Sequence, residues 1–179
     1  MTGPGDATAA GGASSVRLGI IGTGSILDRF LPGAARSAAI DVVAIGSRTA
    51  ERAHQAAADR GIGRAHGSYE ALLGDPDVDA VYICLPNALH HEWTMRSLAA
   101  GKHVLCEKPY STSAAEVDEA FDAAEAAGLV LTEGFMWRHT TQAQRLVEAL
   151  PRIGELRTVR ATFSFTLASD GDVRLSREL

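Results

Sequence analysis

The stretch Arg17-Leu18-Gly19-Ile20-Ile21-Gly22-Thr23-Gly24 places a glycine turn directly after a short apolar run. Such a run predicts a buried strand, and the residues after the turn predict a helix. The first glycine permits a tight turn, and the second lets a pyrophosphate approach the backbone, with helix N–H groups as donors. The third fingerprint position is Leu27 instead of Gly or Ala, so the motif is incomplete. The strand–turn–helix context nevertheless favours nucleotide binding over a structural turn.

Strands and helices alternate along the rest of the chain. Apolar runs predict further strands at 40–45, 79–84, 103–106 and 129–131. Periodicity and capping signals predict helices at 25–38, 49–60, 68–73, 88–100, 113–128 and 142–150. Pro32 and Gly33 are expected to break or kink the first of these helices. Strands that alternate with helices favour an α/β fold with a doubly wound parallel sheet.

The last part of the chain has a different pattern. Between Val159 and Leu167, apolar residues occupy the odd positions and polar residues the even ones, which is typical of a strand with one buried face. A lone amphipathic strand cannot satisfy its backbone, so we expect it to begin a truncated α+β domain with an antiparallel sheet. The alternative is an extra strand that pairs with the first sheet or with another subunit.

This pattern sets the expected domain organisation. Residues 1–15 are expected to form a disordered tail, 16–134 a nucleotide-binding domain, and 135–179 the start of an incomplete substrate and oligomerisation domain. The chain is therefore expected to be the front part of a longer protein.

Composition and charge exclude several classes of function. The 179 residues include 17 Lys or Arg and 22 Asp or Glu, the net charge is −5, and no basic run exceeds two residues. Phosphate contacts need clustered cations, so nucleic-acid binding is not expected. No apolar stretch approaches the ~20 residues of a membrane span. The first fifteen residues lack Lys and Arg and so do not resemble a secretory signal, which leads us to expect a cytoplasmic location.

Two residue patterns that could bind metal are interpreted otherwise. Cys84 and Cys106 both end apolar runs and lack CxxC spacing, so we expect reduced cysteines in neighbouring core strands rather than a disulfide or a metal pair. His91-Glu92 resembles the start of a zinc-protease helix, but position 95 is Met. No metal site is expected.

The end of the second strand indicates the type of cofactor. The chain reads Gly46-Ser47-Arg48 there, with no carboxylate to bind a ribose 2′-hydroxyl or to repel a 2′-phosphate. Ser47 and Arg48 can both donate hydrogen bonds, and the planar guanidinium suits phosphate oxygens. We expect a preference for NADP, with NAD as the second choice. The alternative is that Arg48 is a solvated surface residue.

Two further segments stand at the carboxyl edge of the predicted sheet, where open α/β sheets bind ligands. Leu85-Pro86-Asn87 follows one strand, and its backbone and amide groups are expected to line the ribose and nicotinamide. For His90, packing at a helix N-terminus and contact with a ligand are equal alternatives. Glu107-Lys108-Pro109 follows the next strand. Lys108 is the candidate catalytic residue, because its amine can hydrogen-bond a substrate oxygen or share its proton. The alternative is a structural lysine paired with Glu107.

A last candidate segment, Trp137-Arg138-His139, suits either a pocket wall or a domain junction, and His139 is a weaker candidate for a catalytic acid. The full set of expected cofactor contacts is Gly22, Thr23, Gly24, Ser25, Ile26, Ser47, Arg48, Leu85, Pro86, Asn87, His90, Glu107, Lys108, Pro109, Trp137 and Arg138.

Together these residues resemble the Gfo/Idh/MocA oxidoreductases, the family of glucose-fructose oxidoreductase and inositol dehydrogenase. The matching segments are Gly19 to Gly24, Ser47-Arg48, Leu85-Pro86-Asn87 with His90, Gly101 to Pro109, and Glu133 to His139. The glycine turn is not specific, whereas the segment from His103 to Pro109 is very specific. The resemblance runs from about Val16 to the end of the chain.

The resemblance implies an NADP(H)-dependent oxidoreductase that transfers hydride between nicotinamide and a carbinol or ketone of a sugar, sugar nucleotide or cyclitol. It implies a Rossmann domain and a second domain whose open antiparallel sheet forms a homo-oligomer. It also places Lys108 in the active site and implies that the Lys108–Pro109 bond is often cis. The family's other catalytic acid or base is expected beyond Leu179, so this chain alone is expected not to turn over substrate.

The alternative function is a non-catalytic NAD(P)-binding sensor or regulatory protein of the same fold. The retention of Lys108 favours the enzyme. A pure dinucleotide-binding module, complete at this length, conflicts with the unpartnered strand expected between Val159 and Leu167.

Overall fold

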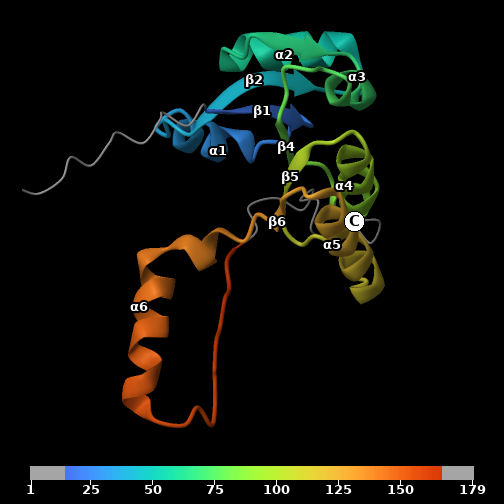
Figure 1. The fold of residues 1–179 in the computed structure, drawn as a ribbon. Helices are drawn as coiled ribbons and strands as arrows, with labels where there is room; N and C mark the ends of the chain where they lie inside the picture. Colours follow the sequence, from blue (N-terminus) through green and yellow to red (C-terminus); the bar gives the residue numbers. More distant parts are fainter. Residues whose placement is uncertain (1–14, 167–179) are drawn as a thin grey trace, which may run out of the picture. The chain divides into compact units, whose positions relative to one another are not determined.

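The computed structural model describes residues 15–166 of the chain. In this range six strands form one sheet in the order β3-β2-β1-β4-β5-β6 (Figure 1). The strands are β1 (Val16–Ile21), β2 (Ile40–Gly46), β3 (Arg64–His66), β4 (Ala80–Ile83), β5 (His103–Cys106) and β6 (Leu131–Glu133). The pairs β1–β2, β2–β3 and β5–β6 are parallel. This is the strand order of a Rossmann-type sheet, so the predicted doubly wound parallel sheet is confirmed. The predicted tail lies outside the described residues, except for Ser15.

The chain divides into two compact units, Met1–Ala80 and Val81–Leu179. The first unit contains the helices α1 (Leu27–Ala34), α2 (Ala50–Arg60) and α3 (Tyr69–Leu73). Leu72 of α3 is fully buried, and a Cβ added to Gly19 of β1 would lie 3.0 Å from its side chain. Glycine at this position therefore lets α3 pack closely against β1.

Ion pairs stabilise the amino-terminal end of β1 in the first unit. The guanidinium of Arg17 donates to both carboxylate oxygens of Asp79, at 3.0 and 2.6 Å, and a further nitrogen lies 2.9 Å from Asp77. The backbone N–H of Arg17 also donates to Asp79 at 2.9 Å. Two parallel hydrogen bonds of this kind fix geometry as well as contributing energy. They hold the start of β1 against the segment that leads into β4.

The second unit contains the 3₁₀ turns and helices that follow β4. They are η1 (Asn87–Leu89), α4 (His90–Ala99), α5 (Ala114–Ala127), η2 (Met136–His139), α6 (Thr141–Ala149) and η3 (Leu150–Ile153). Ser113 caps α5 by accepting from the N–H of Glu116, and Gly128 ends it with a φ of 66°. Cys84 and Cys106 are both buried, and no disulfide joins them in the described part of the chain.

Some predicted bounds differ from the structure. The short strand β3 was not predicted, and α1 spans Leu27–Ala34 instead of 25–38. Pro32 lies inside α1, where it removes one backbone donor, and the helix ends two residues later. The predicted strand at 129–131 begins at Leu131, since the N–H of Leu129 still donates to Ala124 at the end of α5.

The strand predicted from Val159 to Leu167 is not formed by its described residues, 159–166. All of them are exposed, including Phe163 at 90%. A strand requires pairing with a neighbouring strand, and residues 159–166 do not join the sheet that the described residues form, so the apolar alternation alone does not produce one. Leu167 lies outside the described residues.

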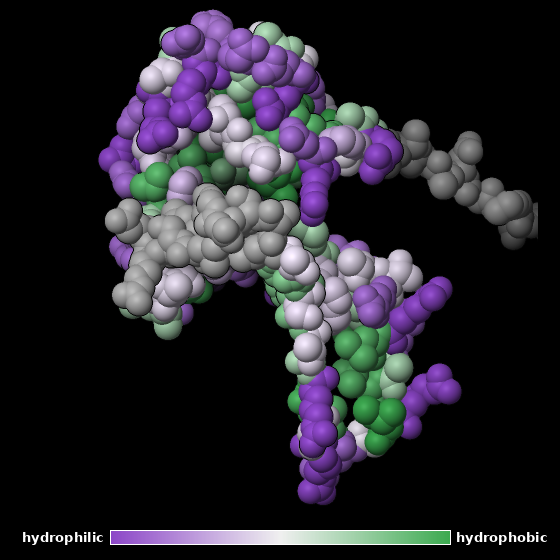
Figure 2. Space-filling model, turned by 180° about the vertical axis from the view of Figure 1, so that it is seen from behind, coloured by the Kyte–Doolittle hydropathy of each residue, from purple (hydrophilic) through white to green (hydrophobic). Residues whose placement is uncertain are grey.

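The segment from α6 to residue 166 exposes many large apolar side chains. Figure 1 shows the chain reversing direction after η3, and Figure 2 shows hydrophobic atoms gathered on this part of the molecule. The exposed side chains are Leu146, Val147, Ile153, Leu156, Val159, Phe163 and Phe165. Among the described residues, no helix is both long and apolar enough to cross a membrane.

Candidate active site

The glycine turn after β1 offers a row of backbone donors. Gly22 has a φ of 108°, a conformation that residues with a side chain rarely adopt, and its N–H donates to Gly46 at 3.0 Å. The first hydrogen bond of the following turn runs from Leu27 to the carbonyl of Gly24 at 3.1 Å. In the described part of the chain, the N–H groups of residues 23–26 donate to no protein acceptor. The turn therefore fits a pyrophosphate, which needs several donors at a helix N-terminus.

The two residues that follow β2 differ in exposure: Ser47 is buried and Arg48 is exposed. Ser47 is 3% exposed, and its backbone N–H donates to His66 of β3 at 3.1 Å. Arg48 is exposed and makes no ion pair with any residue from 15 to 166. Thr49 then caps α2 by accepting from the N–H of Arg52. The guanidinium is thus available to an anion, while β3, which the sequence did not predict, fixes the backbone beside it.

In the second unit, the carboxylate of Glu107 is held from two sides. The hydroxyl of Tyr82 donates to its Oε1 at 2.7 Å, and the backbone N–H of Lys108 donates to its Oε2 at 3.2 Å. Burial and this hydrogen bond raise the pKa of Tyr82 well above its usual range. The N–H of Glu107 also donates to Ile83 of β4 at 3.0 Å. Glu107 therefore fixes the backbone of the loop that carries Lys108.

The side chain of Lys108 projects from this loop without a carboxylate partner in the described part of the chain, and it is exposed. The oxygens of Glu107 are bonded to Tyr82 and to backbone instead, so the alternative of a Lys108–Glu107 pair is not found. The Lys108–Pro109 peptide bond is cis, as the resemblance implied. An exposed amine on a fixed backbone is available to a substrate oxygen.

His90 lies between the two candidate loops of this unit. Its ring is fully buried, with Nδ1 2.8 Å from the carbonyl oxygen of Pro109 and Nε2 2.9 Å from that of Leu85. Both ring nitrogens therefore face protein atoms rather than a ligand. Of the two alternatives for His90, the structure shows the packing one, with a backbone carbonyl of each loop as its partners.

Tyr110 and Glu133 complete the set of residues that hold the Lys108 loop. The backbone N–H of Tyr110 donates to Oε1 of Glu133 at 2.9 Å, and its hydroxyl lies 3.0 Å from Nδ1 of His91. Burial raises the pKa of Tyr110 to about 12. The sequence reasoning missed Tyr82, Tyr110 and the role of Glu133. In the sequence, the only indication of these roles is that the residues place polar groups inside or beside apolar runs.

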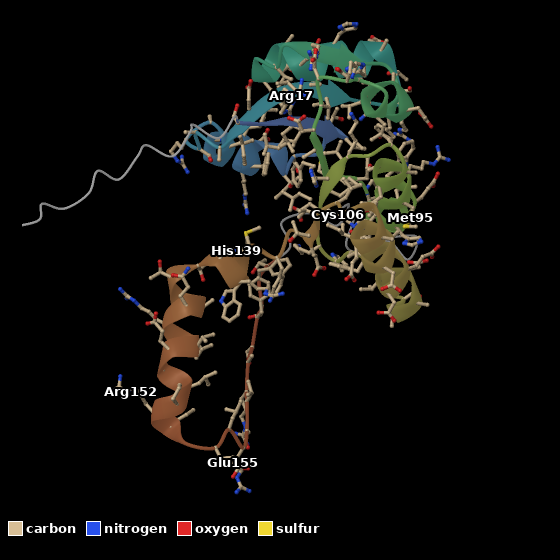
Figure 3. All side chains as sticks on the ribbon, in the orientation of Figure 1. Arg17, Met95, Cys106, His139, Arg152 and Glu155 are labelled. Atoms are coloured by element: carbon tan, nitrogen blue, oxygen red, sulfur yellow. The ribbon has the colours of Figure 1, made fainter. Side chains whose placement is uncertain are left out.

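Trp137 and Arg138 lie apart from these hydrogen bonds. Both belong to η2, which packs against α6, and both are exposed. Figure 3 shows His139 at the η2 end of α6, whereas Arg152 and Glu155 lie at the other end of the helix. Within residues 81–166, no hydrogen bond joins Trp137 or Arg138 to the Leu85 or Lys108 loop. Their part in cofactor binding stays a prediction.

The chain can now be placed in a family. Residues 16–135 match the Gfo/Idh/MocA family model, described as an oxidoreductase family with an NAD-binding Rossmann fold. The protein therefore belongs to the Gfo/Idh/MocA oxidoreductase family, and the predicted resemblance is confirmed.

Several individual relatives are similar to this chain over most of its length. A D-xylose 1-dehydrogenase (NADP(+)) of Haloferax volcanii is 41% identical over 163 residues, which is 90% of this chain and 50% of the relative. A dTDP-3,4-didehydro-2,6-dideoxy-alpha-D-glucose 3-reductase of Streptomyces violaceoruber is 42% identical over 169 residues, 92% of this chain and 49% of the relative. The chain spans about half the length of the curated relatives it matches.

A solved structure shows the same similarity. The 3-ketoreductase KijD10 from Actinomadura kijaniata, in complex with NADP and TDP-benzene, is 40% identical and superimposes with a TM-score of 0.71. The match covers 77% of this chain and 42% of KijD10.

Proposed function

We propose that the whole protein is an NADP(H)-dependent oxidoreductase acting on a carbinol or ketone of a sugar, sugar nucleotide or cyclitol. The observation that carries this proposal is the exposed amine of Lys108, on a loop whose backbone is fixed by Glu107, His90 and Glu133. A side chain held only to preserve the fold would not need so many restraints on its backbone. Preorganised groups of this kind are typical of catalytic sites.

Each unit, taken by itself, carries groups that suit a part of the cofactor. In the first unit, the backbone donors of residues 23–26 suit the pyrophosphate, and Arg48 suits a 2′-phosphate. In the second unit, Leu85-Pro86-Asn87 and Glu107-Lys108-Pro109 are proposed to line the ribose and nicotinamide, since each follows a strand at its carboxyl end. The names of the xylose dehydrogenase and the KijD10 complex, which both include NADP, support this choice of cofactor.

Lys108 is proposed to bind the oxygen atom of the substrate. NADP(H) would supply or accept the hydride when bound. The Lys108 ammonium would donate a hydrogen bond to the carbonyl or hydroxyl oxygen and hold the reacting carbon in place. The oxygens of Glu107 accept hydrogen bonds from the Tyr82 hydroxyl and the Lys108 backbone N–H, which leaves the Lys108 amine to the substrate.

The substrate class rests on the relatives, whose names include a xylose dehydrogenase, sugar-nucleotide reductases and a scyllo-inositol dehydrogenase. A homo-oligomer formed through a C-terminal sheet, a cytoplasmic location and a domain boundary near residue 134 stay predictions.

The experiment is a comparison of the whole protein with its Lys108→Ala and Lys108→Arg variants, using NADP with a panel of aldoses, cyclitols and sugar nucleotides. Loss of a catalytic proton donor is expected to lower kcat by about 10²–10⁴-fold, while the dissociation constant for NADPH stays nearly unchanged. Full activity in Lys108→Ala would contradict the assigned role. Cofactor binding without turnover of any substrate in the panel would favour the sensor protein instead.

A further inference from the structure

The loop from Glu107 to Tyr110 is hydrogen-bonded through its backbone at successive positions. The N–H of Lys108 donates to Glu107, and the N–H of Tyr110 donates to Glu133. The carbonyl oxygen of Pro109 is 2.8 Å from the ring of His90. His90 is the member of this set that also reaches the other candidate loop, through the carbonyl oxygen of Leu85 at 2.9 Å.

The chemistry of these two contacts is unusually constrained. A carbonyl oxygen only accepts hydrogen bonds, and a neutral imidazole carries a proton on one ring nitrogen, so the tautomer decides which of the two carbonyl oxygens receives the hydrogen bond. The ring itself is fully buried, so its two nitrogens are directed at protein atoms. Removing the imidazole would take away the ring contact of two backbone carbonyl oxygens, one in each loop.

We propose that His90 is a positioning residue, which couples the Leu85-Pro86-Asn87 loop to the Lys108-Pro109 loop and so sets where Lys108 stands relative to the nicotinamide subsite. This inference rests on the proposed function. It differs from the earlier expectation that His90 contacts the cofactor, because both ring nitrogens are directed at backbone oxygens. His90 acts through the two loops and touches neither substrate nor cofactor.

A neighbouring residue on the same helix provides a matched control. Ser97 is also fully buried on α4, but its hydroxyl donates to the carbonyl of Trp93 in its own helix, at 2.6 Å. Ser97→Ala therefore removes a buried hydrogen bond from α4 without removing one from either loop. An effect that appears in His90→Leu and not in Ser97→Ala is therefore caused by the lost contacts between His90 and the two loops.

The first test does not depend on activity. Hydrogen exchange is measured at the amides of Lys108 and Tyr110 in the 179-residue chain, in His90→Leu, His90→Gln and Ser97→Ala. We expect His90→Leu to speed exchange at these amides by at least about fivefold. His90→Gln keeps a donor for one carbonyl, so its exchange rates should lie between those of His90→Leu and the unmodified chain. The exchange rates of Ser97→Ala should match those of the unmodified chain. If His90→Leu does not fold, the exchange rates of His90→Gln alone test the proposal. Unchanged exchange at both amides in the folded His90 variants would overturn the proposal.

The second test is a double-mutant cycle in the whole protein. Misplacing a catalytic group by a small distance costs between about ten- and a hundredfold in rate, so His90→Leu or His90→Gln should lower kcat with little change in KM. In the Lys108→Ala background the same substitution should lower kcat by less than about twofold, because there is no amine left to misplace. Effects that multiply independently would overturn the positioning role. If Lys108→Ala alone is fully active, the proposed function has failed, and the exchange experiment still decides whether His90 holds the loops.

Discussion

The hydroxyl of Tyr82 on β4 donates a 2.7 Å hydrogen bond to Glu107, which follows β5. Tyr82 is 2% exposed, whereas Lys108, next in the chain after Glu107, is exposed. A buried donor thus holds the carboxylate of Glu107, while the neighbouring Lys108 stays exposed. Hydrogen bonds to a charged acceptor are stronger than neutral ones, so this contact has consequences for stability.

Tyr82→Phe removes the hydroxyl without leaving a cavity. Loss of a hydrogen bond to a charged group is expected to lower the free energy of unfolding by about 1.5–3 kcal/mol. Urea denaturation of the chain measures this, with Glu107→Gln and the double variant completing a cycle. A strongly non-additive cycle is expected, since the two groups bond each other. Purely additive effects would show that the bond does not form in solution.

Asp75 gives a prediction for the effect of pH on stability. Burial acts to raise the pKa of the Asp75 carboxyl. Three contacts outweigh burial and hold this pKa below its ordinary value: a hydrogen bond from the backbone N–H of Asp77, a hydrogen bond to His66 at 3.0 Å, and the charge of Arg64. A lowered pKa in the folded state stabilises the protein above the unfolded-state pKa, near 3.8. This contribution is lost as the pH falls through the folded-state value.

Asp75→Asn should therefore be less stable than the original chain at pH 7, and the gap should narrow below about pH 4. Urea unfolding at pH 7, 5 and 3 measures the difference. Asp41→Asn is the control, because Asp41 is exposed, and it should change stability by less than about 0.5 kcal/mol. A gap that stays constant across this range would mean that Asp75 does not titrate as described.

Gly22→Ala tests the turn after β1. A side chain at a φ of 108° is expected to cost about 1–3 kcal/mol of stability, and relaxation of the turn should weaken NADPH binding. Gly63→Ala is the matched control, since a Cβ there meets nothing within 4 Å and its φ is not positive. Thermal unfolding and NADPH titration of both variants are compared. Equal stability and affinity in the two would contradict the role given to Gly22.

The sequence predicted most of this fold because its signals are local. Thr49, Ser113, Gly61 and Gly128 lie at the helix ends where their chemistry predicts caps, and the structure confirms them. β3 was missed because Arg64–His66 is too short to show a period, and its existence depends on pairing with β2. The strand expected from Val159 failed in its described part for the opposite reason: its period is clear, but a partner is needed to form it.

The candidate site was predicted only in part. The residues that carry chemistry stand in recognisable segments, such as Glu107-Lys108-Pro109. The residues that hold them, including Tyr82 and His90, act through contacts between positions 19 or 25 residues apart in the sequence. No local pattern encodes such a contact, so the sequence left the role of His90 open between two alternatives.

The most direct test of the central proposal is a fluorescence titration of the 179-residue chain with NADPH and NADH, repeated with Arg48→Ala. We predict tighter binding of NADPH, because Arg48 is exposed and neither of the two residues directly after β2, Ser47 and Arg48, carries a carboxylate. Removing the guanidinium should weaken NADPH binding by about tenfold or more and leave NADH nearly unchanged. Equal affinity for the two cofactors, or tighter binding of NADH, would contradict the account.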